Sequence, residues 1–493
     1  MDCLLDASLS IALQNFRTYI FVHLFKPAII VMKEPHVVVI CLDTVRKDFY
    51  DKYAQQLTNL ATHRFHEMRA PSSWSVPSHA AMFSGELPHE TGIHTYSRDF
   101  GNLDIEQTFL ADFDMYRTVA ISANTFASSA FGFDSLFDQC ISISPSSRFP
   151  NGLDVNDFVR NYDREGVAVF LNRALNHSHP LKSVANAILF KLYEATQGRK
   201  ITQPFDFGGK AIARGVRNEL CSATDPTFIF ANFMDAHSPH TLFRDLKDTT
   251  IDKVPSSFTS LDLDYEEINA DSELNGHETE IEYVRQLYGG SIAYLDNVVA
   301  NLVTSVQETI DRETVFVITS DHGENLGYPD DDWLIGHGDS LSEGLLHVPF
   351  DIISDTHYGE TNTRTSLLDL GTIIGRLRDG RTLPDFDNSV VLAEVAGPSG
   401  DSPDGQKNGR AIRAAYVGDR KLVIDSEGKS KLFNVSGPPN SQTLTVNNSQ
   451  RFDQFDDWFS IPIEEFVERA RERTELVTID ASVEDRLERL GYR

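Results

Sequence analysis

The sequence predicts an α/β fold: a doubly wound, mostly parallel sheet with helices on both faces, followed by a smaller C-terminal α+β module. Three observations support this fold class. Several short apolar runs read as buried strands, longer helical segments lie between them, and a loop-like segment precedes the C-terminal part. The strand runs are β-branched and nearly continuously apolar, which is typical of parallel strands covered on both faces. Their alternation with helices indicates a doubly wound sheet.

Five apolar runs are the predicted strands. They cover residues 36–43, 116–124, 227–235, 313–321 and 347–354. The longest helical pattern covers residues 280–309, and the acidic, polar segment 243–279 is expected to form a surface excursion.

The composition divides the chain into three parts. Residues 396–410, AGPSGDSPDGQKNGR, are rich in Gly, Pro, Ser and Asp and indicate a domain boundary. We therefore expect a main domain over residues 35–395. The smaller C-terminal module, residues 411–493, is expected to contain two strands joined by a turn, a third strand and a charged helix.

Residues 1–34 read as an N-terminal extension. They are fairly apolar, but Arg17, His23 and Lys26 interrupt them before any run reaches the length of a membrane span. They also lack the pattern of a secretory signal peptide. We therefore expect a cytoplasmic protein, with weak attachment to a membrane surface through this segment as an added expectation.

The charge of the chain is strongly negative. Its 493 residues carry a formal net charge of −29, and only 14 of the 44 basic residues are lysine. An acidic surface with little lysine favours a halophilic protein, adapted to high salt. Because no basic patch is present, nucleic-acid binding through phosphate neutralisation is excluded. The four cysteines are far apart and form no CxxC pair, which argues against a disulfide framework and a thiolate zinc site.

Polar residues follow the ends of four predicted strands. They are Asp43, Asn124, Asp235, and the pair Asp321 and His322. A single Asp in such a place often caps the next helix. In open α/β sheets, however, ligands bind beyond the carboxyl ends of the strands, so four such ends predict one shared site.

The residue types at this edge suit a divalent metal. Asp43, Asp321 and His322 supply two carboxylates and an imidazole, and we expect them to hold one ion of calcium, magnesium or manganese. A serine hydroxyl bound to the same ion would be acidified into a usable nucleophile.

The stretch SSWSVPSHAAMFSG, residues 72–85, supplies the candidate nucleophile. Ser75 is favoured because Pro77 follows closely and a helix is expected to start there, with its free N–H groups directed at an anionic ester. Ser72, Ser73 and Ser78 are interpreted as turn and cap residues.

Five motifs occur in the order found in a known family. They are LDTVRKD (42–48), SVPSHAAMFSGELPHETG (75–92), MDAHSPH (234–240), TSDHGE (319–324) and GHGDSLSEGLLHVPF (336–350). Together they resemble the sulfatase family of the alkaline phosphatase superfamily. The segment RKLVIDSEGKSKLFNVSGPPNS (420–441) resembles the C-terminal module of sulfatases. The resemblance covers residues 35–445 and implies an alkaline-phosphatase-like fold.

The resemblance also implies roles for individual residues. Asp43, Asp321 and His322 would bind the metal, and Ser75 would take the place of the nucleophile, with His79 steadying it. Two histidines, His237 and His337, would contact the ester oxygens and help protonate the leaving group. Asn124 and His240 would bind substrate.

A second metal is an alternative. Asp235 with His237 or His240, plus His337, would supply a carboxylate and two imidazoles for a two-metal clamp. One metal is favoured, because MDAHSPH looks more like the segment that carries the substrate histidine of sulfatases.

The chain departs from the family pattern at three positions. Many sulfatases convert the Cys or Ser of a C/S-x-P-S-R pattern into formylglycine, but here Ser75 is followed by His79 in place of the arginine. Thr44 stands where many members have a metal-binding aspartate, and His322 stands where many have asparagine. The changes at Thr44 and His322 favour the phosphatase and phosphodiesterase side of the superfamily.

We therefore expect an enzyme that cleaves or transfers a sulfuryl group through Ser75, on a small-molecule or glycan sulfate ester. An intracellular sulfated sugar or a step of glycan biosynthesis fits the expected cytoplasmic location. The alternative is a metal-dependent phosphodiesterase or phosphotransferase on the same scaffold. The third hypothesis is a non-catalytic binding protein that keeps the fold.

Overall fold

The computed structural model describes residues 34–493 apart from 145–147, 150, 154, 156–157, 159–165, 197–200, 249–250, 252, 271–272, 387–388, 398–409, 448–454, 473–482, 485 and 488–493. The predicted N-terminal extension and most of the predicted boundary loop lie outside these residues. Within them, every helix is too short or too polar to cross a bilayer.

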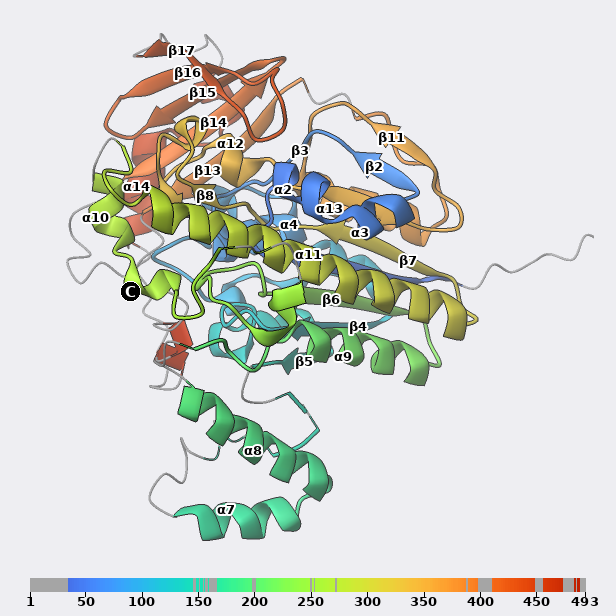
Figure 1. The fold of residues 1–493 in the computed structure, drawn as a ribbon. Helices are drawn as coiled ribbons and strands as arrows, with labels where there is room; N and C mark the ends of the chain where they lie inside the picture. The colour runs from blue at the N-terminus through green and yellow to red at the C-terminus, as the bar shows by residue number, and fades with distance from the viewer. Residues whose placement is uncertain are drawn as a thin grey trace, which may run out of the picture. The chain divides into compact units, whose positions relative to one another are not determined.

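Eight strands form the main sheet (Figure 1). In spatial order they are β11 (Gly359–Thr361), β2 (His63–Phe65), β10 (Phe350–Ile353), β7 (Thr314–Thr319), β1 (His36–Leu42), β6 (Thr227–Phe233), β4 (Arg117–Ser122) and β5 (Gln139–Ser142). Central β1 runs parallel to β6 and β7, and β4 runs parallel to β6 and β5. The predicted mostly parallel α/β sheet is confirmed.

Strand β10 corrects one part of the prediction. The run 347–354 reads as another parallel strand, but β10 pairs antiparallel with both β7 and β2. Between β7 and β10 the chain forms only short elements: β8 (Asn325–Leu326), the 3₁₀ turn η9 (Pro329–Asp331), β9 (Ile335–Gly336) and α12 (Glu343–Leu346). A parallel return needs a crossover of a dozen or more residues, usually a helix. Here no long helix carries the chain back to the opposite edge of the sheet, so β10 starts at the edge at which β7 ends and runs in the opposite direction.

Both faces of the sheet are covered, which explains the continuous apolar runs. Along β1, Val38, Ile40 and Leu42 point into one core, and the alternating residues point into the other. The first core is closed by α2 (Lys47–Tyr53), α3 (Gln55–Leu60), α9 (Gly209–Ser222) and α11 (Glu278–Thr309). Figure 1 shows α11 lying along this face, and its bounds match the predicted helix closely. The second core is closed by α4 (Ser75–Ser84), α13 (Leu370–Arg378) and the inner side of a second sheet.

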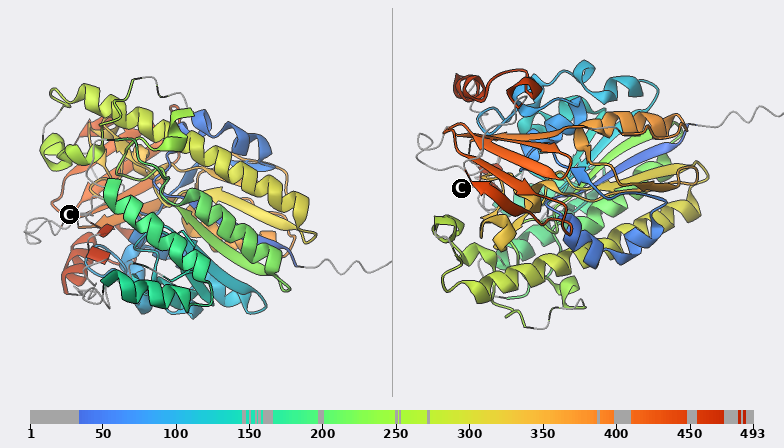
Figure 2. Two further views of the ribbon diagram at one scale, coloured as in Figure 1. Left: turned by 60° about the horizontal axis from the view of Figure 1, so that its bottom comes forward. Right: turned by 90° about the horizontal axis from the view of Figure 1, so that it is seen from above.

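The second sheet is antiparallel and has five strands (Figure 2, right view, orange to red). They are β13 (Val391–Ala396), β14 (Ala411–Val417), β15 (Arg420–Asp425), β16 (Ser430–Asn434) and β17 (Thr443–Asn447), and α14 (Ile463–Glu472) packs against β14. The predicted module is therefore present, but β13 pairs along its full length with β14. This strand, which the sequence assigned to the end of the main domain, lies in the second sheet.

A buried ionic cluster joins the second sheet to α12 and to the short strand that contains Arg69, both of which lie outside the main sheet. The Glu343 carboxylate lies 2.9 Å from an Arg69 guanidinium nitrogen and 3.0 Å from Lys421 Nζ, which comes from β15. All three side chains are almost fully buried. Removing one partner of such a cluster would leave a buried charge unpaired, so a substitution of any of the three should destabilise the contact between the second sheet and the main domain. The chain from Pro35 onward forms one compact unit.

A helical hairpin between β5 and α9 was not foreseen from the sequence. It consists of α7 (Gly166–Leu175) and α8 (Pro180–Thr196) and projects from the body of the molecule (Figure 1). The hairpin has a small core of its own, which includes Phe158, Phe170 and Ala174. The other short strands and α-helices are β3 (Met68–Arg69), α5 (Pro88–Thr91), α10 (Tyr265–Ala270) and β12 (Thr365–Ser366), and several 3₁₀ turns lie between the elements.

Candidate active site

Residues from three strand ends meet at the carboxyl edge of the main sheet. Asp43 follows β1, Asn124 follows β4, and Asp321 follows β7. The Asn124 amide donates to Asp43 Oδ2 at 2.8 Å, and the main-chain N–H of Thr44 lies 3.4 Å from Asp321 Oδ1. Thr44 adopts a left-handed φ of 63°, which is unusual for a β-branched residue. Such strain is found at functional sites, where the surrounding structure enforces it.

Ser75 lies at the centre of this group. It is the first residue of α4, it is fully buried, and Pro77 lies in the first turn, where a missing N–H costs no helical hydrogen bond. Its Oγ is 3.4 Å from Asp43 Oδ2, 3.4 Å from His322 Nε2 and 3.1 Å from Asn124 Nδ2. The structure thus brings Ser75 together with Asp43 and His322, the two predicted metal ligands that lie within 3.4 Å of its hydroxyl.

The predicted metal ligands form a compact set. Asp43, Asp321 and His322 each offer one ligand atom, and these atoms all lie within 4.8 Å of one another. Asp43 Oδ1 and Asp321 Oδ2 accept no hydrogen bond from any described residue, although His79 Nε2 and His322 Nε2 lie 3.2 Å and 3.6 Å from Asp321 Oδ2. A buried carboxylate oxygen left without a partner is costly. The donor set therefore fits a divalent cation, which would neutralise both carboxylates.

His322 is oriented for a ligand role. Its Nδ1 lies 2.8 Å from the Gly323 carbonyl oxygen, which can only accept, so Nδ1 carries the proton. Nε2 is then the free acceptor, directed at Ser75 and the two carboxylates. Burial lowers the pKa of His322 despite the nearby charge of Asp321, which keeps the ring neutral. A backbone carbonyl that fixes the tautomer in this way is typical of metal-binding histidines.

The two carboxylates have pKa values that are pushed apart. Burial and the charge of Asp321 raise the pKa of Asp43 to about 6. The pKa of Asp321 is lowered: burial opposes this, but His322 and His79 outweigh it. Two acids this close cannot both ionise at their ordinary pKa values.

His79 lies one helical turn beyond Ser75 and contacts a different residue from the one expected. Its Nε2 lies 3.2 Å from Asp321 Oδ2, 3.9 Å from Cys41 Sγ and 3.5 Å from the Asn232 amide nitrogen. It therefore contacts the predicted metal ligand Asp321 and not the Ser75 hydroxyl. Cys41, His79 and Asp321 form a second set with metal-like spacing. Burial raises the pKa of Cys41 well above its usual value, which disfavours the thiolate needed for binding.

His337 and His237 form the outer wall of the site. The His337 ring centroid lies 4.7 Å from that of His322 and 5.1 Å from that of His237. His337 Nδ1 lies 3.1 Å from a Glu324 carboxylate oxygen. Burial alone would lower the pKa of His337, but the charge and hydrogen bond of Glu324 outweigh it and raise that pKa. Burial lowers the pKa of His237 to about 4, so the pKa values of these two neighbouring imidazoles are shifted in opposite directions.

His240 and Asp235 lie to the side of this group. The His240 ring packs edge-on against Tyr288, and burial lowers its pKa to about 4. Asp235 points away from the histidines: its Oδ1 accepts the N–H of Phe207 at 2.9 Å, just before α9. Within the described part of the chain, both metal-like sets contain Asp321 and neither contains Asp235 or His337. The alternative second metal therefore has no prepared site among these residues.

Two further residues of the site were missed from the sequence. Asn232, inside β6, donates to Asp43 Oδ2 at 3.2 Å. Glu324, the last residue of the TSDHGE motif, holds His337. A charged residue directly after a metal-like SDHG motif is a usable signal for Glu324. Asn232 gives a weaker signal: it is a lone amide in an otherwise apolar strand.

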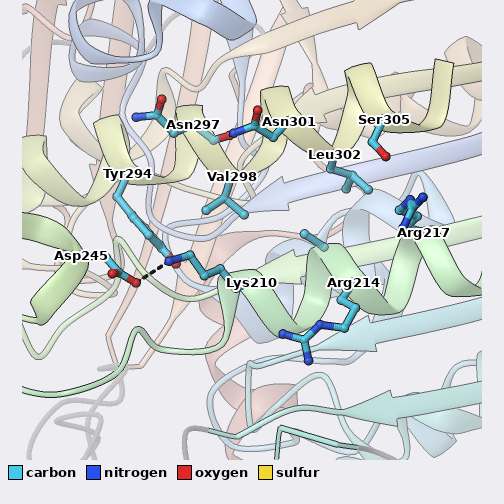
Figure 3. Close-up of a pocket in the computed structure, with 11 residues that line it drawn as sticks. Lys210, Arg214, Arg217, Asp245, Tyr294, Asn297, Val298, Asn301, Leu302 and Ser305 are labelled. Atoms are coloured by element: carbon cyan, nitrogen blue, oxygen red, sulfur yellow. Dashed lines mark hydrogen bonds and ion pairs between the residues drawn. The ribbon is translucent and has the colours of Figure 1, made fainter. Parts of the chain in front are cut away.

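A separate groove of about 560 Å³ lies between α9 and α11 (Figure 3). Lys210, Arg214 and Tyr294 are among its lining residues, and Lys210 pairs with Asp245 across it at 2.5 Å. None of its lining residues belongs to the cluster around Ser75. The groove and the cluster are therefore distinct features.

Comparison with known proteins agrees with this geometry. The family described as Sulfatase matches residues 35–377, more than half of the chain. Comparison with curated proteins gives no match. Among solved structures, the phosphonate monoester hydrolase of Agrobacterium radiobacter is 16% identical with a TM-score of 0.56, covering 90% of this chain and 96% of that one.

Two further solved structures have the same fold. The phosphonate monoester hydrolase from Silicibacter pomeroyi is 14% identical with a TM-score of 0.54, covering 82% of this chain and 90% of that one. A protein solved in complex with its substrate D-glucosamine-2-N,6-O-disulfate is 13% identical with a TM-score of 0.53, covering 93% of this chain and 98% of that one. At these identities the similarity shows a shared alkaline-phosphatase-like fold.

Proposed function

The chain belongs to the sulfatase family, and on that premise we propose that it hydrolyses a sulfate ester with Ser75 as the nucleophile. One observation carries the proposal: Ser75 Oγ lies 3.4 Å from both Asp43 and His322, inside a buried set of metal-type ligands. A serine hydroxyl needs such activation to attack an ester.

The metal-type ligands, Ser75 and His337 each have a role in the proposed reaction. A divalent cation held by Asp43, Asp321 and His322 would lower the pKa of the Ser75 hydroxyl and offset the ester's negative charge. Ser75 Oγ passes its proton to Asp43 Oδ2, 3.4 Å away, and forms a bond to sulfur as the bond from sulfur to the alcohol oxygen breaks. The N–H groups at the start of α4 favour the anionic sulfuryl oxygens. His337, held by Glu324, donates a proton to the departing alcohol.

Water completes the turnover in the proposed reaction. It attacks the sulfur of the Ser75 sulfate ester, releases hydrogen sulfate and restores the serine hydroxyl. A sugar hydroxyl in place of water would make the same step a sulfuryl transfer. We favour hydrolysis, since it is the chemistry of the family to which the chain belongs.

A sulfated sugar is the proposed substrate class. One protein of the same fold was solved with a disulfated glucosamine as its substrate. Two polar side chains, His237 and His337, lie next to each other beside His322 and suit an ester between a charged sulfate and a hydroxylated ring.

The test compares matched chromogenic esters. We expect the purified protein, loaded with calcium, magnesium or manganese, to hydrolyse 4-nitrophenyl sulfate faster than 4-nitrophenyl phosphate. The intact mass of the peptide containing Ser75 shows whether formylglycine has formed, since that conversion removes two hydrogen atoms. A clear preference for phosphate would contradict the proposal.

A phosphoester or phosphonate monoester hydrolase is the second candidate. Two observations favour it: the imidazole of His322 in the metal set, and the fold shared with two phosphonate monoester hydrolases. The same comparison of esters, extended to a phosphonate monoester, separates it from the first.

A further inference from the structure

The projecting hairpin carries an unusual share of exposed apolar residues. Among the described residues, twelve large hydrophobic side chains are exposed, and five of them lie in the two helices of the hairpin. These five are Leu171, Leu175, Leu181, Ile188 and Leu192. Leu181, at the start of α8, is 87% exposed. Scattered apolar residues on a surface need no explanation, but a concentration of them marks an interaction site.

The exposed residues follow helical spacing. On α8, Leu181, Ile188 and Leu192 are seven and four residues apart and share one face. On α7, Leu171 and Leu175 are four residues apart. The core of the hairpin is built from other residues, such as Phe170 and Ala174. The exposed leucines and isoleucine are therefore not needed to hold the two helices together.

The charge of the hairpin is opposite to that of the whole chain. Residues 166–196 contain Arg173, Lys182 and Lys191 but only one acidic residue, Glu194, which gives a net charge of +2 in a chain of −29. Basic and apolar side chains on one helical element are the combination that binds the interface of an anionic bilayer. Beyond a Debye length of about 8 Å at physiological salt, the acidic remainder is largely screened from such a surface.

The hairpin starts from the same edge of the sheet as the active site. It leaves the sheet after the carboxyl end of β5 and returns just before α9. An ion pair between Arg148 and Asp206 ties its two connecting segments together. Asn186 of α8 also accepts the N–H of Phe149 at 3.1 Å, which anchors the hairpin near its base.

We propose that the α7–α8 hairpin docks the protein onto the surface of a bilayer that contains anionic lipids. Leu181, Ile188 and Leu192 enter the interface, and Lys182 and Lys191 contact the headgroups. The active site, at the same edge of the sheet, then faces sulfate esters carried by membrane lipids. This last step rests on the proposed sulfatase function, whereas the docking itself does not.

The experiment measures co-sedimentation of the full chain with vesicles of phosphatidylcholine, with or without phosphatidylglycerol. The Ser75→Ala background removes any effect of turnover. We expect binding to the phosphatidylglycerol vesicles, and a partition coefficient at least about tenfold lower after Leu181→Ser, Ile188→Ser and Leu192→Ser together. The matched control, Leu261→Ser with Leu444→Ser and Val446→Ser, changes three residues that are exposed elsewhere and should bind like the parent.

The charge is tested separately. Lys182→Glu with Lys191→Glu should abolish the preference for phosphatidylglycerol, whereas Arg381→Glu with Lys429→Glu, at exposed sites outside the hairpin, should not. Circular dichroism and the melting temperature check that each variant is folded.

Three outcomes would overturn the docking proposal. In the first, the parent fails to bind vesicles. In the second, the triple hairpin variant binds vesicles as the parent does. In the third, light scattering shows that the parent is a dimer and the triple variant a monomer, and neither binds vesicles. The last result would assign the hairpin to contact with a second copy of the chain. Vesicle binding without hydrolysis of sulfate esters would contradict only the proposed function.

Discussion

Ser75 allows a sharp test at the scale of single residues. Ser75→Ala should leave the fold intact, since a hydroxyl at a helix start contributes at most about 1 kcal/mol. It should nevertheless eliminate turnover, because the covalent route is lost. The measurement is the hydrolysis rate of the ester found in the substrate comparison, together with the melting temperature.

Two neighbouring serines serve as controls for Ser75. Ser78 Oγ donates to the main-chain oxygen of Asp321 at 2.6 Å, and Ser72 Oγ donates to that of Glu394 at 2.7 Å. Both contacts are structural, so Ser72→Ala and Ser78→Ala should retain turnover. If one of them abolishes turnover while Ser75→Ala does not, the nucleophile has been assigned wrongly.

His337 offers a second test, based on the leaving group. A sugar alcohol is a poor leaving group and needs a proton, whereas 4-nitrophenolate leaves without one. His337→Ala should therefore slow a sugar sulfate by about 10²- to 10⁴-fold and the nitrophenyl ester much less. Glu324→Gln, which keeps the shape but loses the charge beside His337, should show the same pattern more weakly. Equal losses on both esters would indicate a role in binding instead.

The sequence predicted the centre of this site better than its surroundings. Asp43, Asp321 and His322 could be found because each follows an apolar strand, and strand ends of a parallel sheet converge. The contact of His79 with Asp321 could not, because it depends on how α4 is rotated over β1 and β7. Residues such as Asn232 support the site from inside a strand, where no local pattern distinguishes them.

At the scale of elements, His36 at the start of β1 predicts a pH effect on stability. Burial, with Arg312 nearby, lowers its pKa to about 4, and its Nδ1 accepts the N–H of Thr227 at 3.1 Å. In the unfolded chain His36 has a pKa near 6.5, so as the pH falls it takes up its proton at a higher pH than in the folded protein. The contribution of neutral His36 is complete above about pH 6.5 and is lost as the pH falls toward 4.

His36→Asn isolates this contribution, because the amide oxygen of Asn can accept the same N–H. The slope of unfolding free energy against pH should become shallower by up to about 1.4 kcal/mol per pH unit between pH 4 and 6.5, less where solvent screens the charge. Urea unfolding at several pH values measures it. An unchanged slope would show that His36 does not titrate with folding.

The sequence predicted five strands of the main sheet correctly, but it gave the wrong direction for β10 and the wrong sheet for β13. The strands at 36–43, 116–124, 227–235 and 313–321 are present, because buried β-branched runs have few alternatives. The direction of β10 depends on whether a crossover helix precedes it, and the 30 residues before it contain only short elements. The assignment of β13 to the second sheet depends on pairing across a polar loop, which apolar patterning does not encode.

The whole molecule should respond to its metal through its stability. Two buried carboxylates lie close together in the site, so a cation that binds only the folded state should raise the melting temperature. We expect a shift with calcium, magnesium or manganese that is reversed by a chelator. Asp321→Asn should reduce this shift strongly, whereas Asp235→Asn, outside the set, should keep it. A shift that survives Asp321→Asn would place the metal elsewhere.

The charge of −29 makes a prediction for the whole molecule in salt. Like charges on one compact body repel one another, and the repulsion is relieved when the Debye length falls from about 10 Å at 0.1 M to about 3 Å at 1 M salt. Buried pairs such as Arg46 and Asp331, 2.8 Å apart, are screened far less and should persist. The melting temperature should therefore rise steadily with potassium chloride up to molar concentrations. Sucrose, which favours burial without screening charge, is the control and should give a smaller rise. A melting temperature that is flat or falls with salt would count against adaptation of this acidic surface to high salt.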